Sequence, residues 1–462
     1  MSRYVIPSVT IPALYSAYRS YFYGSDEKTP VRTIENAITQ LNKNENVEEA
    51  VRFLYSLNET HSYLNTLTPA ASAMLALRGC DVCRYIPVKA SNAERFEKFE
   101  DVLATFHLGN EWNAAIAWIN RVACSEEDLA CPEEWLKSFP PNAFSEDIVP
   151  FLLYVYDEFC QENKDMKLLV LKTLANIAGN SQEFATSIFT SKWLPILSEL
   201  VTQGKTLDER ITAHKICQNA LYSLGVLDYQ LCSDIYELYI PERVAEVDVV
   251  LIHGLRGSVG YTWRQNDASK NIETECWPKD WIPMDIQEPM RILGIDYPSY
   301  ILQFTGTMES LQVRADRFKQ QLTAAGIGKR PLVFICHSMG GLLAKRILLD
   351  MPELAEKTVG IMFVATPHKG SPIASWGVKD IGVSQDVIFL RETNELNKQM
   401  NEEFGNLEIP VIVSMVETKE SNLIGTARGI VVPTQSAVFD KGAVYHIEEV
   451  HQNEVNKRKT RA

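Results

Sequence analysis

Residues 332–341 read Leu-Val-Phe-Ile-Cys-His-Ser-Met-Gly-Gly. An apolar run typical of a buried strand ends here at a serine, and a helical pattern, Leu-Leu-Ala-Lys-Arg-Ile-Leu-Leu, follows at once. This order predicts a tight strand-to-helix turn that holds Ser338 above the end of a sheet, as nucleophilic serines are held. The helix N-terminus would place backbone N–H groups and positive dipole beside the hydroxyl. The usual form of the turn is Gly-x-Ser-x-Gly, and Cys336 stands in the place of its first glycine.

The sequence on both sides of this turn alternates between strand and helix patterns. This alternation predicts a mostly parallel sheet with covered faces. Together with the serine turn it indicates an α/β-hydrolase domain. We predict strands at 246–252, 291–297, 331–336, 358–364 and 409–416, short strands near 429–432 and 443–447, helices at 308–326, 340–350 and near 391–404, a Trp-rich loop at 262–283 and an irregular stretch at 367–390.

The first half of the chain, residues 30–230, has a different pattern. Apolar residues recur at helical spacing, and strand patterns are almost absent. A faint repeat is visible, since Ile148-Val-Pro-Phe-Leu152 returns as Trp193-Leu-Pro-Ile-Leu197 45 residues later. A period of about 40–47 residues is typical of armadillo or HEAT repeats, which stack to leave a concave face for partners. The alternative is an irregular helical domain. Helices are predicted over 46–56, 66–77, 98–107, 147–160, 165–178, 183–202 and 208–224.

These patterns predict a multidomain protein of the α and α/β classes. Residues 1–29 form an acid-poor N-terminal arm whose composition suits either a targeting segment or a plain packed arm. Residues 30–235 form an armadillo/HEAT-like helical domain. Residues 236–462 form the α/β-hydrolase domain.

Composition argues against several other classes of protein. The net charge of −14 argues against a nucleic-acid-binding protein. The sequence contains no run of about 20 apolar residues, so we predict no membrane-spanning helix. Nine cysteines are scattered, which favours reduced thiols, and the pair Cys80 and Cys83 lacks the further ligands of a zinc site. We expect neither a metal nor a cofactor.

Acyl transfer by a serine needs a general base, an acid that orients the base and an oxyanion hole. The residue after the nucleophile, Met339, is expected to donate one backbone N–H to the oxyanion. The second donor is expected from the loop after strand 246–252, which reads His253-Gly254-Leu255. Leu255 is the predicted donor, because Gly254 permits a backbone path that brings this amide inward.

The acid should follow a strand that lies between the serine and the histidine in the chain. Glu417 follows the predicted strand 409–416 and is our assignment, with Asp440 as its rival. Asp296 precedes Ser338 and so breaks the expected order.

The base should be a histidine late in the chain. His446 lies in an alternating segment that is typical of a strand, whereas His451 follows Glu-Glu-Val in a polar segment. A loop can carry an imidazole over the serine more easily than a strand can. We therefore predict His451 as the base and keep His446 as the alternative.

Several segments in the second half together resemble a known family. They resemble the serine active site-containing protein 1 family, a lipase-class family of α/β-hydrolases with an armadillo-like N-terminal region. The piece His-Ser-Met-Gly-Gly is common to many hydrolases, whereas Trp-Arg-Gln and Cys-Trp-Pro-Lys are more specific. The matching segments are Leu-Ile-His-Gly-Leu-Arg-Gly (251–257), Thr-Trp-Arg-Gln (262–265), Cys-Trp-Pro-Lys-Asp-Trp (276–281), His-Ser-Met-Gly-Gly-Leu-Leu (337–343), Ala-Thr-Pro-His-Lys-Gly-Ser (365–371), Val-Glu-Thr (416–418), Val-Val-Pro-Thr-Gln-Ser-Ala (431–437) and His-Gln-Asn (451–453).

The resemblance implies a role in phosphatidylglycerol remodelling, with effects on intracellular cholesterol handling. It also implies action at mitochondria and their contacts with the endoplasmic reticulum, on a phospholipid at a membrane surface. A protein partner for the helical domain is expected from the concave face of its repeats. On the family pattern the serine falls on Ser338, the acid on Glu417 and the histidine on His451. The chain departs from that pattern at Cys336 and in lacking a Cys-Lys-Pro sequence near His451.

Two other functions are compatible with the sequence. One is a non-catalytic scaffold at mitochondrial or endoplasmic reticulum membranes, in which the helical array binds a partner and the hydrolase domain is degenerate. The other is hydrolysis of a soluble ester or peptide, since motifs do not define the lining of a substrate pocket.

Overall fold

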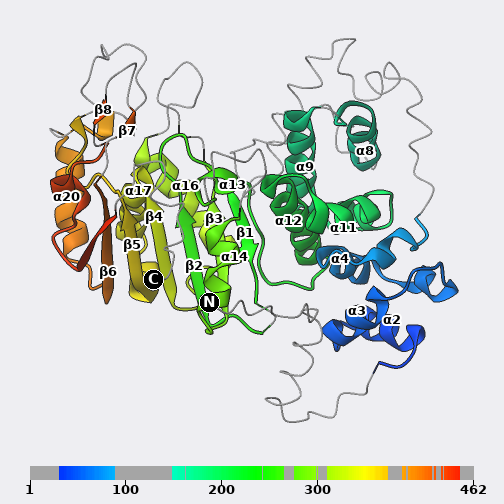
Figure 1. Cartoon of the computed structure of the whole chain (residues 1–462). Helices are drawn as coiled ribbons and strands as arrows, with labels where there is room; N and C mark the ends of the chain where they lie inside the picture. Colours follow the sequence, from blue (N-terminus) through cyan, green and yellow to red (C-terminus); the bar gives the residue numbers. More distant parts are fainter. Residues whose placement is uncertain are drawn as a thin grey trace, which may run out of the picture.

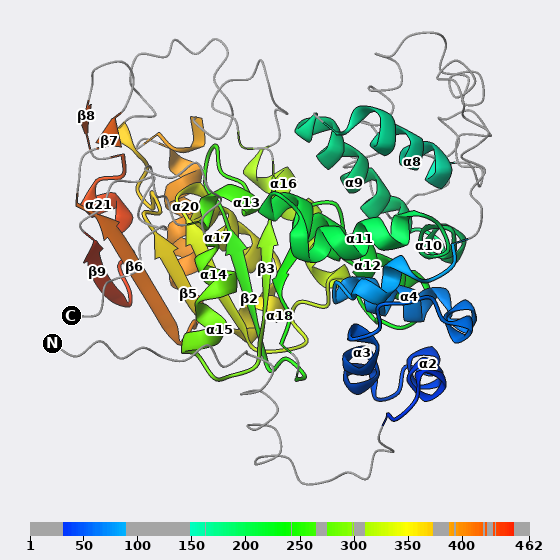
Figure 2. The same ribbon diagram turned by 45° about the vertical axis from the view of Figure 1, so that its right-hand side comes forward.

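A computed structural model places a helical part and an α/β part of the chain side by side (Figure 1). Helices α2 to α12 make up the first part, and a sheet covered by helices makes up the second (Figures 1 and 2). The described residues are 31–88, 148–161, 163–241, 243–264, 275–297, 299, 310–372, 388–391, 394–418, 421–422, 428–429 and 431–447.

The α/β part is built on a seven-stranded sheet in the order β1-β3-β2-β4-β5-β6-β9. Strand β1 pairs antiparallel with β3, and every other neighbouring pair in this sheet is parallel. The mostly parallel sheet predicted from the sequence is therefore confirmed. The strands are β1 (Ile235–Tyr239), β2 (Val247–Ile252), β3 (Met290–Ile295), β4 (Leu332–His337), β5 (Thr358–Val364), β6 (Val411–Glu417) and β9 (Ala443–Ile447), and β7 (Ser421–Asn422) pairs separately with β8 (Arg428–Gly429).

Alternate residues of the central strand β2 belong to two different apolar cores. Val250 and Ile252 pack in the core shared with helices α16, α17 and α20. Val249 and Leu251 pack in a second core that contains Trp263. Because successive side chains of a strand point to opposite faces, a continuous apolar run such as this one covers the sheet on both sides. The helices of this part are α13 (Val259–Thr262), α14 (Trp277–Asp280), α15 (Ile282–Asp285), α16 (Leu311–Ala324), α17 (Met339–Asp350), α18 (Pro352–Lys357), α20 (Glu395–Gly405) and α21 (Thr434–Ala437).

The helical part follows the predicted pattern closely. Most of its helices start at a Thr, Ser or Asn whose side chain accepts a backbone N–H of the first turn, as Thr206 does from Glu209. The repeated segments that begin at Ile148 and Trp193 each open a helix, α8 and α11. The helices are α2 (Ile34–Asn42), α3 (Val47–Tyr55), α4 (Pro69–Leu77), α8 (Ile148–Phe159), α9 (Lys164–Ala178), α10 (Gln182–Phe189), α11 (Trp193–Gln203) and α12 (Leu207–Ser223), with 3-10 turns η1 (Ser62–Thr66) and η2 (Asp81–Arg84).

Helix α12 joins the two parts. Leu207 and Ile211 from its first turns lie in the same apolar core as Tyr236 and Leu238 of the edge strand β1. Lys215 is 1% exposed, and its Nζ donates hydrogen bonds to the carbonyls of Cys232 and Ser233, just before β1. The helical part is thus packed against the sheet through a buried surface.

Some sequence predictions need correction. The helix predicted over 183–202 is two helices, α10 and α11, and the Trp-rich loop 262–283 contains the short helix α14. A helix of four residues is too short to show the helical spacing of apolar residues in the sequence. Strand β1 was not predicted, since it falls in the segment taken as a domain boundary. The strand predicted at 291–297 ends at Ile295, so Asp296 lies just beyond it. The helix predicted at 98–107 and the arm at 1–29 lie outside the described residues.

Candidate active site

Ser338 occupies the turn between β4 and α17, as predicted. Its backbone φ of +52° and ψ of −125° lie in a region that L-residues rarely adopt. The N–H of Ser338 donates to the carbonyl of Val364 at the end of β5, at 2.8 Å. The side chain therefore stands beyond the carboxyl ends of the central strands, at the start of a helix, and the residue is 7% exposed.

The two glycines after Met339 are required by close packing. A Cβ on Gly340 would lie 2.4 Å from the carbonyl oxygen of Ile252, and one on Gly341 would lie 2.2 Å from Oγ1 of Thr366. Helix α17 can therefore approach β2 and β5 only with hydrogen atoms at these positions. Cys336, which replaces the usual glycine, is fully buried in β4, and burial raises the pKa of its thiol well above the ordinary value. It behaves as a small core residue.

The loop after β2 lies directly against the serine turn. A Cβ on Gly254 would lie 2.6 Å from Cβ of Ser338, so the absence of a side chain lets the two backbones meet. The next residue is Leu255, and Met339 opens α17 on the other side of Ser338. Within the described residues neither the Leu255 N–H nor the Met339 N–H donates a hydrogen bond. The structure thus brings both predicted oxyanion donors next to Ser338.

The carbonyl of Gly254 is fixed by three donors. It accepts from Nδ1 of the buried His253 at 2.8 Å, from Oγ of Ser299 at 3.2 Å and from the N–H of Gly257 at 3.1 Å. A carbonyl only accepts, so Nδ1 of His253 carries a proton. Because the peptide unit is planar and trans, a fixed carbonyl also fixes the opposite direction of the Leu255 N–H. This amide is therefore oriented before any substrate binds, which is what electrostatic stabilisation of an oxyanion needs.

The ring of His253 is itself held in place by residues that follow β3. Its Nε2 lies 3.2 Å from the N–H of Tyr297 and 3.5 Å from Oδ1 of Asp296. The ring stacks on Tyr297, with centroids 4.2 Å apart, and the Tyr297 hydroxyl donates to the His253 carbonyl at 2.6 Å. Burial opposes ionisation of Asp296, but its contacts with the His253 ring and with the charged Lys172 outweigh burial and lower the pKa of Asp296.

Asp296 and Tyr297 were not recognised from the sequence as parts of the site. Both were placed inside a strand, and Asp296 was considered only as an acid that breaks the triad order. The signal that could have found them is their position just past the carboxyl end of a parallel strand, where ligands and catalytic groups gather.

Glu417 is the last residue of β6 and is fully buried. Its Oε1 accepts the N–H of Val432 at 2.5 Å. The segment that contains Val432 is tied in turn to the loop after β5, since Ser371 Oγ donates to the Val431 carbonyl at 2.5 Å. The structure therefore places the predicted acid at the same carboxyl edge of the sheet as Ser338.

The two alternative residues are both exposed. Asp440 is exposed and pairs with Lys369 at 3.2 Å. His446 lies within the edge strand β9, opposite Val416, and is exposed. His451, the predicted base, lies outside the described residues, and β9 ends at Ile447 opposite Glu417.

A buried polar cluster lies behind the serine turn. Nζ of Lys345, on α17, lies 2.6 Å from Nδ1 of His368 and donates to Oδ1 of Asn401 on α20. The ammonium group also faces the ring of Phe439, 4.3 Å from its centroid. Burial lowers the pKa of Lys345 and of His368 well below their ordinary values. The cluster holds α17, which begins directly after Ser338, against the loop after β5. His368 therefore stabilises the position of the serine turn.

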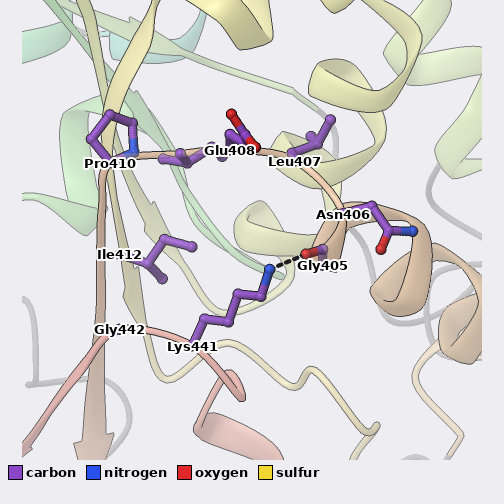
Figure 3. A pocket seen from close by; sticks show the side chains of 9 residues that line it. Gly405, Asn406, Leu407, Glu408, Pro410, Ile412, Lys441 and Gly442 are labelled. Carbon is purple, nitrogen blue, oxygen red and sulfur yellow. Dashed lines mark hydrogen bonds between the residues drawn. The ribbon is translucent and has the colours of Figure 1, made fainter.

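A cavity of about 390 Å³ lies at the other edge of the sheet (Figure 3). It is lined by Pro410 and Ile412 at the start of β6 and by Lys441, which donates to the Gly405 carbonyl at the end of α20. Because β4 and β6 run in the same direction, the amino end of β6 is remote from Ser338. The cavity is not part of the candidate active site.

Two further findings concern the described residues alone. No group of three or more His, Cys, Asp or Glu side chains among them is arranged to hold a metal ion. None of the described helices is long and apolar enough to cross a bilayer. Cys80 and Cys83 are buried free thiols, and burial raises the pKa of Cys80 to about 11.

Comparison with known proteins finds one group of proteins with a similar sequence. It is 28% identical to Protein SERAC1 of Danio rerio over 321 residues and 29% identical to Protein SERAC1 of Homo sapiens over 315 residues. Each match covers 62% of this chain and 47% of the relative, so the chain spans about half the length of the curated relatives it matches. No protein-family profile matches the chain.

Among solved structures the chain is similar to a lipase, BlEst2 of Bacillus licheniformis, at 16% identity and a TM-score of 0.33, covering 48% of this chain and 92% of that one. It is also similar to phospholipase PlaB of Legionella pneumophila, at 17% identity and a TM-score of 0.32, covering 42% and 44%. Likeness at this level adds nothing to what the sheet order and the serine turn already establish. The sequence matches do confirm the resemblance predicted from the motifs: this chain is similar in sequence to the SERAC1 proteins.

Proposed function

We propose that this chain is a serine esterase or acyltransferase that acts on ester-linked acyl chains. The observation that carries the proposal is the contact between two backbone segments. Ser338 sits at φ +52° on a strand-to-helix turn, and Gly254 approaches it so closely that a Cβ there would lie 2.6 Å from Cβ of Ser338. Leu255 directly follows Gly254 and Met339 directly follows Ser338, which supports their N–H groups as the two donors to an oxyanion formed at Ser338.

The proposed reaction proceeds through an acyl-enzyme. Oγ of Ser338 attacks the ester carbonyl carbon while its proton passes to His451, and the tetrahedral oxyanion accepts hydrogen bonds from Leu255 and Met339. His451 then gives the proton to the leaving alcohol oxygen as the carbon–oxygen bond breaks. Water, or the hydroxyl of a lysolipid, attacks the acyl-enzyme with His451 again as the base, which releases a fatty acid or forms a new ester.

Glu417 is the proposed acid that orients His451. Its burial at the end of β6 suits this role, whereas Asp440 is exposed and paired with Lys369. Strand β9 ends at Ile447, opposite Glu417, and four further residues span at most about 14 Å. Four residues are therefore enough to bring a histidine at position 451 near Glu417, which supports its assignment as the base.

The proposed substrate is a phospholipid, and phosphatidylglycerol is the specific member that the resemblance to the SERAC1 family implies. The same resemblance supports action at a membrane surface, at mitochondria or their contacts with the endoplasmic reticulum, with an effect on cholesterol handling. It also supports an armadillo-like stack for the helical part, whose two repeated segments open α8 and α11. A protein partner for that part belongs to the same proposal.

The test is covalent labelling by a fluorophosphonate, followed by turnover of phosphatidylglycerol in vesicles. We expect the wild-type protein to be labelled and the Ser338→Ala variant not to be, with the rate of acyl release falling by about 10³-fold or more. His451→Ala should lose as much, and His446→Ala should retain most of the activity. Free fatty acid and newly acylated lysolipid, measured separately, distinguish hydrolysis from transfer.

Equal labelling of wild type and Ser338→Ala, both folded by circular dichroism, would contradict the proposal and favour the non-catalytic scaffold. Loss of activity in His446→Ala together with a fully active His451→Ala would keep the serine mechanism and reassign its base. Turnover of a soluble ester with none of phosphatidylglycerol would keep the mechanism and replace the substrate.

A further inference from the structure

A residue just beyond β3, next to the loop that carries one predicted oxyanion donor, is contacted from the helical part of the chain. Lys172 lies on α9, and its Nζ is 3.7 Å from Oδ2 of Asp296. The other oxygen of this carboxylate, Oδ1, accepts the N–H of Val259 at 3.1 Å and lies 3.5 Å from Nε2 of His253. One carboxylate thus connects α9, the first residue of α13 and the histidine that precedes Gly254.

From His253 the connection continues through backbone atoms to the site. Nδ1 of His253 donates to the Gly254 carbonyl, and the planar peptide unit passes that orientation to the Leu255 N–H. His253 is one of the three donors that hold this carbonyl, so a rotation of its ring would loosen the orientation of the Leu255 amide. The connection from Lys172 to the Leu255 amide thus consists of an ion pair, a 3.5 Å contact between Asp296 and the His253 ring, a hydrogen bond and a rigid peptide plane.

The surroundings of Lys172 leave little freedom for relative movement. A Cβ on Gly260 would lie 2.2 Å from Oδ1 of Asp208, so the start of α12 packs directly on α13. The Tyr236 ring of β1 lies under Nζ of Lys215 at 4.2 Å, with Nζ of Lys172 5.9 Å from the same ring. These contacts place α9 at a defined position relative to the loop after β2.

We propose that Lys172 is a positioning residue for the oxyanion hole. Through Asp296 and His253 it sets the direction of the Leu255 N–H, and so couples the helical part of the chain to catalysis at Ser338. The inference rests on the proposed serine mechanism. It follows that a protein bound to the helical part can change turnover by shifting α9, without touching the substrate.

The exposure of the ion pair allows this role to be separated from stability. The side chains of Lys172 and Asp296 are 33% and 24% exposed, and ion pairs this open to water contribute little to the free energy of unfolding. Loss of the Lys172 charge should therefore alter the orientation of the loop more than the stability of the protein. If Lys172 had only a structural role, loss of its charge would lower the stability of the protein more than it altered the orientation of the loop.

The experiment compares ester hydrolysis by full-length wild type and Lys172→Ala. We expect kcat to fall about 3–10-fold with KM unchanged, because an oxyanion donor acts on the transition state and not on the bound substrate. Inhibition by a trifluoromethyl ketone, which forms an oxyanion with the serine, should weaken by the same factor. Lys172→Arg should restore both, since it keeps the charge.

Two further variants make the result specific. Lys167→Ala removes a lysine from the same helix, but one that pairs with Glu209 inside the helical part at 2.9 Å, and it should leave kcat unchanged. In an Asp296→Asn background the additional effect of Lys172→Ala should disappear, because the carboxylate that transmits it is gone.

The inference is overturned if an active wild type and Lys172→Ala have the same kcat and the same inhibition constant. It is also overturned if Lys167→Ala loses as much kcat as Lys172→Ala does. Failure of the serine mechanism itself is recognised separately, by a wild-type protein that is not labelled by fluorophosphonate, and in that case the inference falls with it.

Discussion

The backbone of Ser338 is strained in its position on the turn. A φ of +52° with ψ of −125° costs an L-residue about 1–3 kcal/mol, and glycine adopts it without a steric penalty. The surrounding packing holds the turn in place, since Gly340 and Gly341 meet β2 and the loop after β5 with no room for a Cβ. Strained turns of this kind are found where a functional side chain has to be held in place.

We therefore expect Ser338→Gly to be more stable than Ser338→Ala. Both variants remove the hydroxyl, but only glycine relieves the strain, and the difference in the free energy of unfolding should be about 1 kcal/mol. Urea unfolding followed by circular dichroism measures it. An alanine variant that is as stable as the glycine variant, or more stable, would mean that the turn is not strained.

At the scale of elements, the contact between α12 and β1 contains a buried carboxyl. Glu237 of β1 is 2% exposed and accepts hydrogen bonds from Nε2 of Gln218 on α12 and from the hydroxyl of Tyr229, the latter at 3.2 Å. Burial raises the pKa of Glu237 to about 7, against the nearby charge of Arg291, which lowers it. The carboxyl thus takes up its proton well above the pH at which an exposed glutamate does.

This gives the stability of the protein a defined pH dependence. Between about pH 4.5 and 7 the folded protein keeps a proton on Glu237 that the unfolded chain has lost. The contribution of Glu237 to the free energy of unfolding therefore falls as the pH rises through this range, by up to about 3 kcal/mol. The buried His214 and His368, whose pKa values burial lowers, contribute with the opposite sign, so the effect of Glu237 is measured as the difference between wild type and its variant. Glu237→Gln should remove this fall and be the more stable protein at pH 8, as urea unfolding at a series of pH values would measure.

The control for this variant is Glu35→Gln, which removes an exposed carboxylate from α2. It should follow the wild-type dependence at every pH. If the Glu237→Gln curve also runs parallel to that of wild type, the buried carboxyl does not take up a proton on folding.

At the scale of the whole molecule, the two parts share a core. Leu207 and Ile211 of α12 are buried in the same cluster as Leu251 and Ile292, which lie in the middle of the sheet. Neither part can unfold without exposing apolar surface of the other. This explains how an ion pair from α9 can act on a loop of the α/β part.

We expect the described helices and the sheet to unfold together, in a single transition seen alike by circular dichroism and by tryptophan fluorescence. Leu207→Ala should lower the free energy of that whole transition by about 2–4 kcal/mol, since Leu207 is 2% exposed. Leu396→Ala, at a position that is 67% exposed on α20, is the matched control and should change little. Two separate transitions, with only one shifted by Leu207→Ala, would contradict a shared core.

Much of this architecture could be read from the sequence because its signals are local. A strand that ends at a serine, with two glycines and a helix behind it, is contained in ten residues, and β4, α17 and the turn between them are found where they were predicted. The loop His253-Gly254-Leu255 was recognised in the same way, from a strand end followed by glycine. Glu417 was assigned because it directly follows a clear predicted strand, and its role as the acid stays a prediction. The assignment of His451 stays a prediction.

What only the tertiary structure decided are the contacts between segments that lie far apart in the chain. No local pattern indicates that Lys172 meets Asp296, that Lys345 lies against His368, or that α12 supplies two residues to the core of the sheet. Turn chemistry and the period of apolar residues are set by neighbours within a few positions. The partner of a charged side chain is set by how whole elements pack, and the sequence does not express that packing locally.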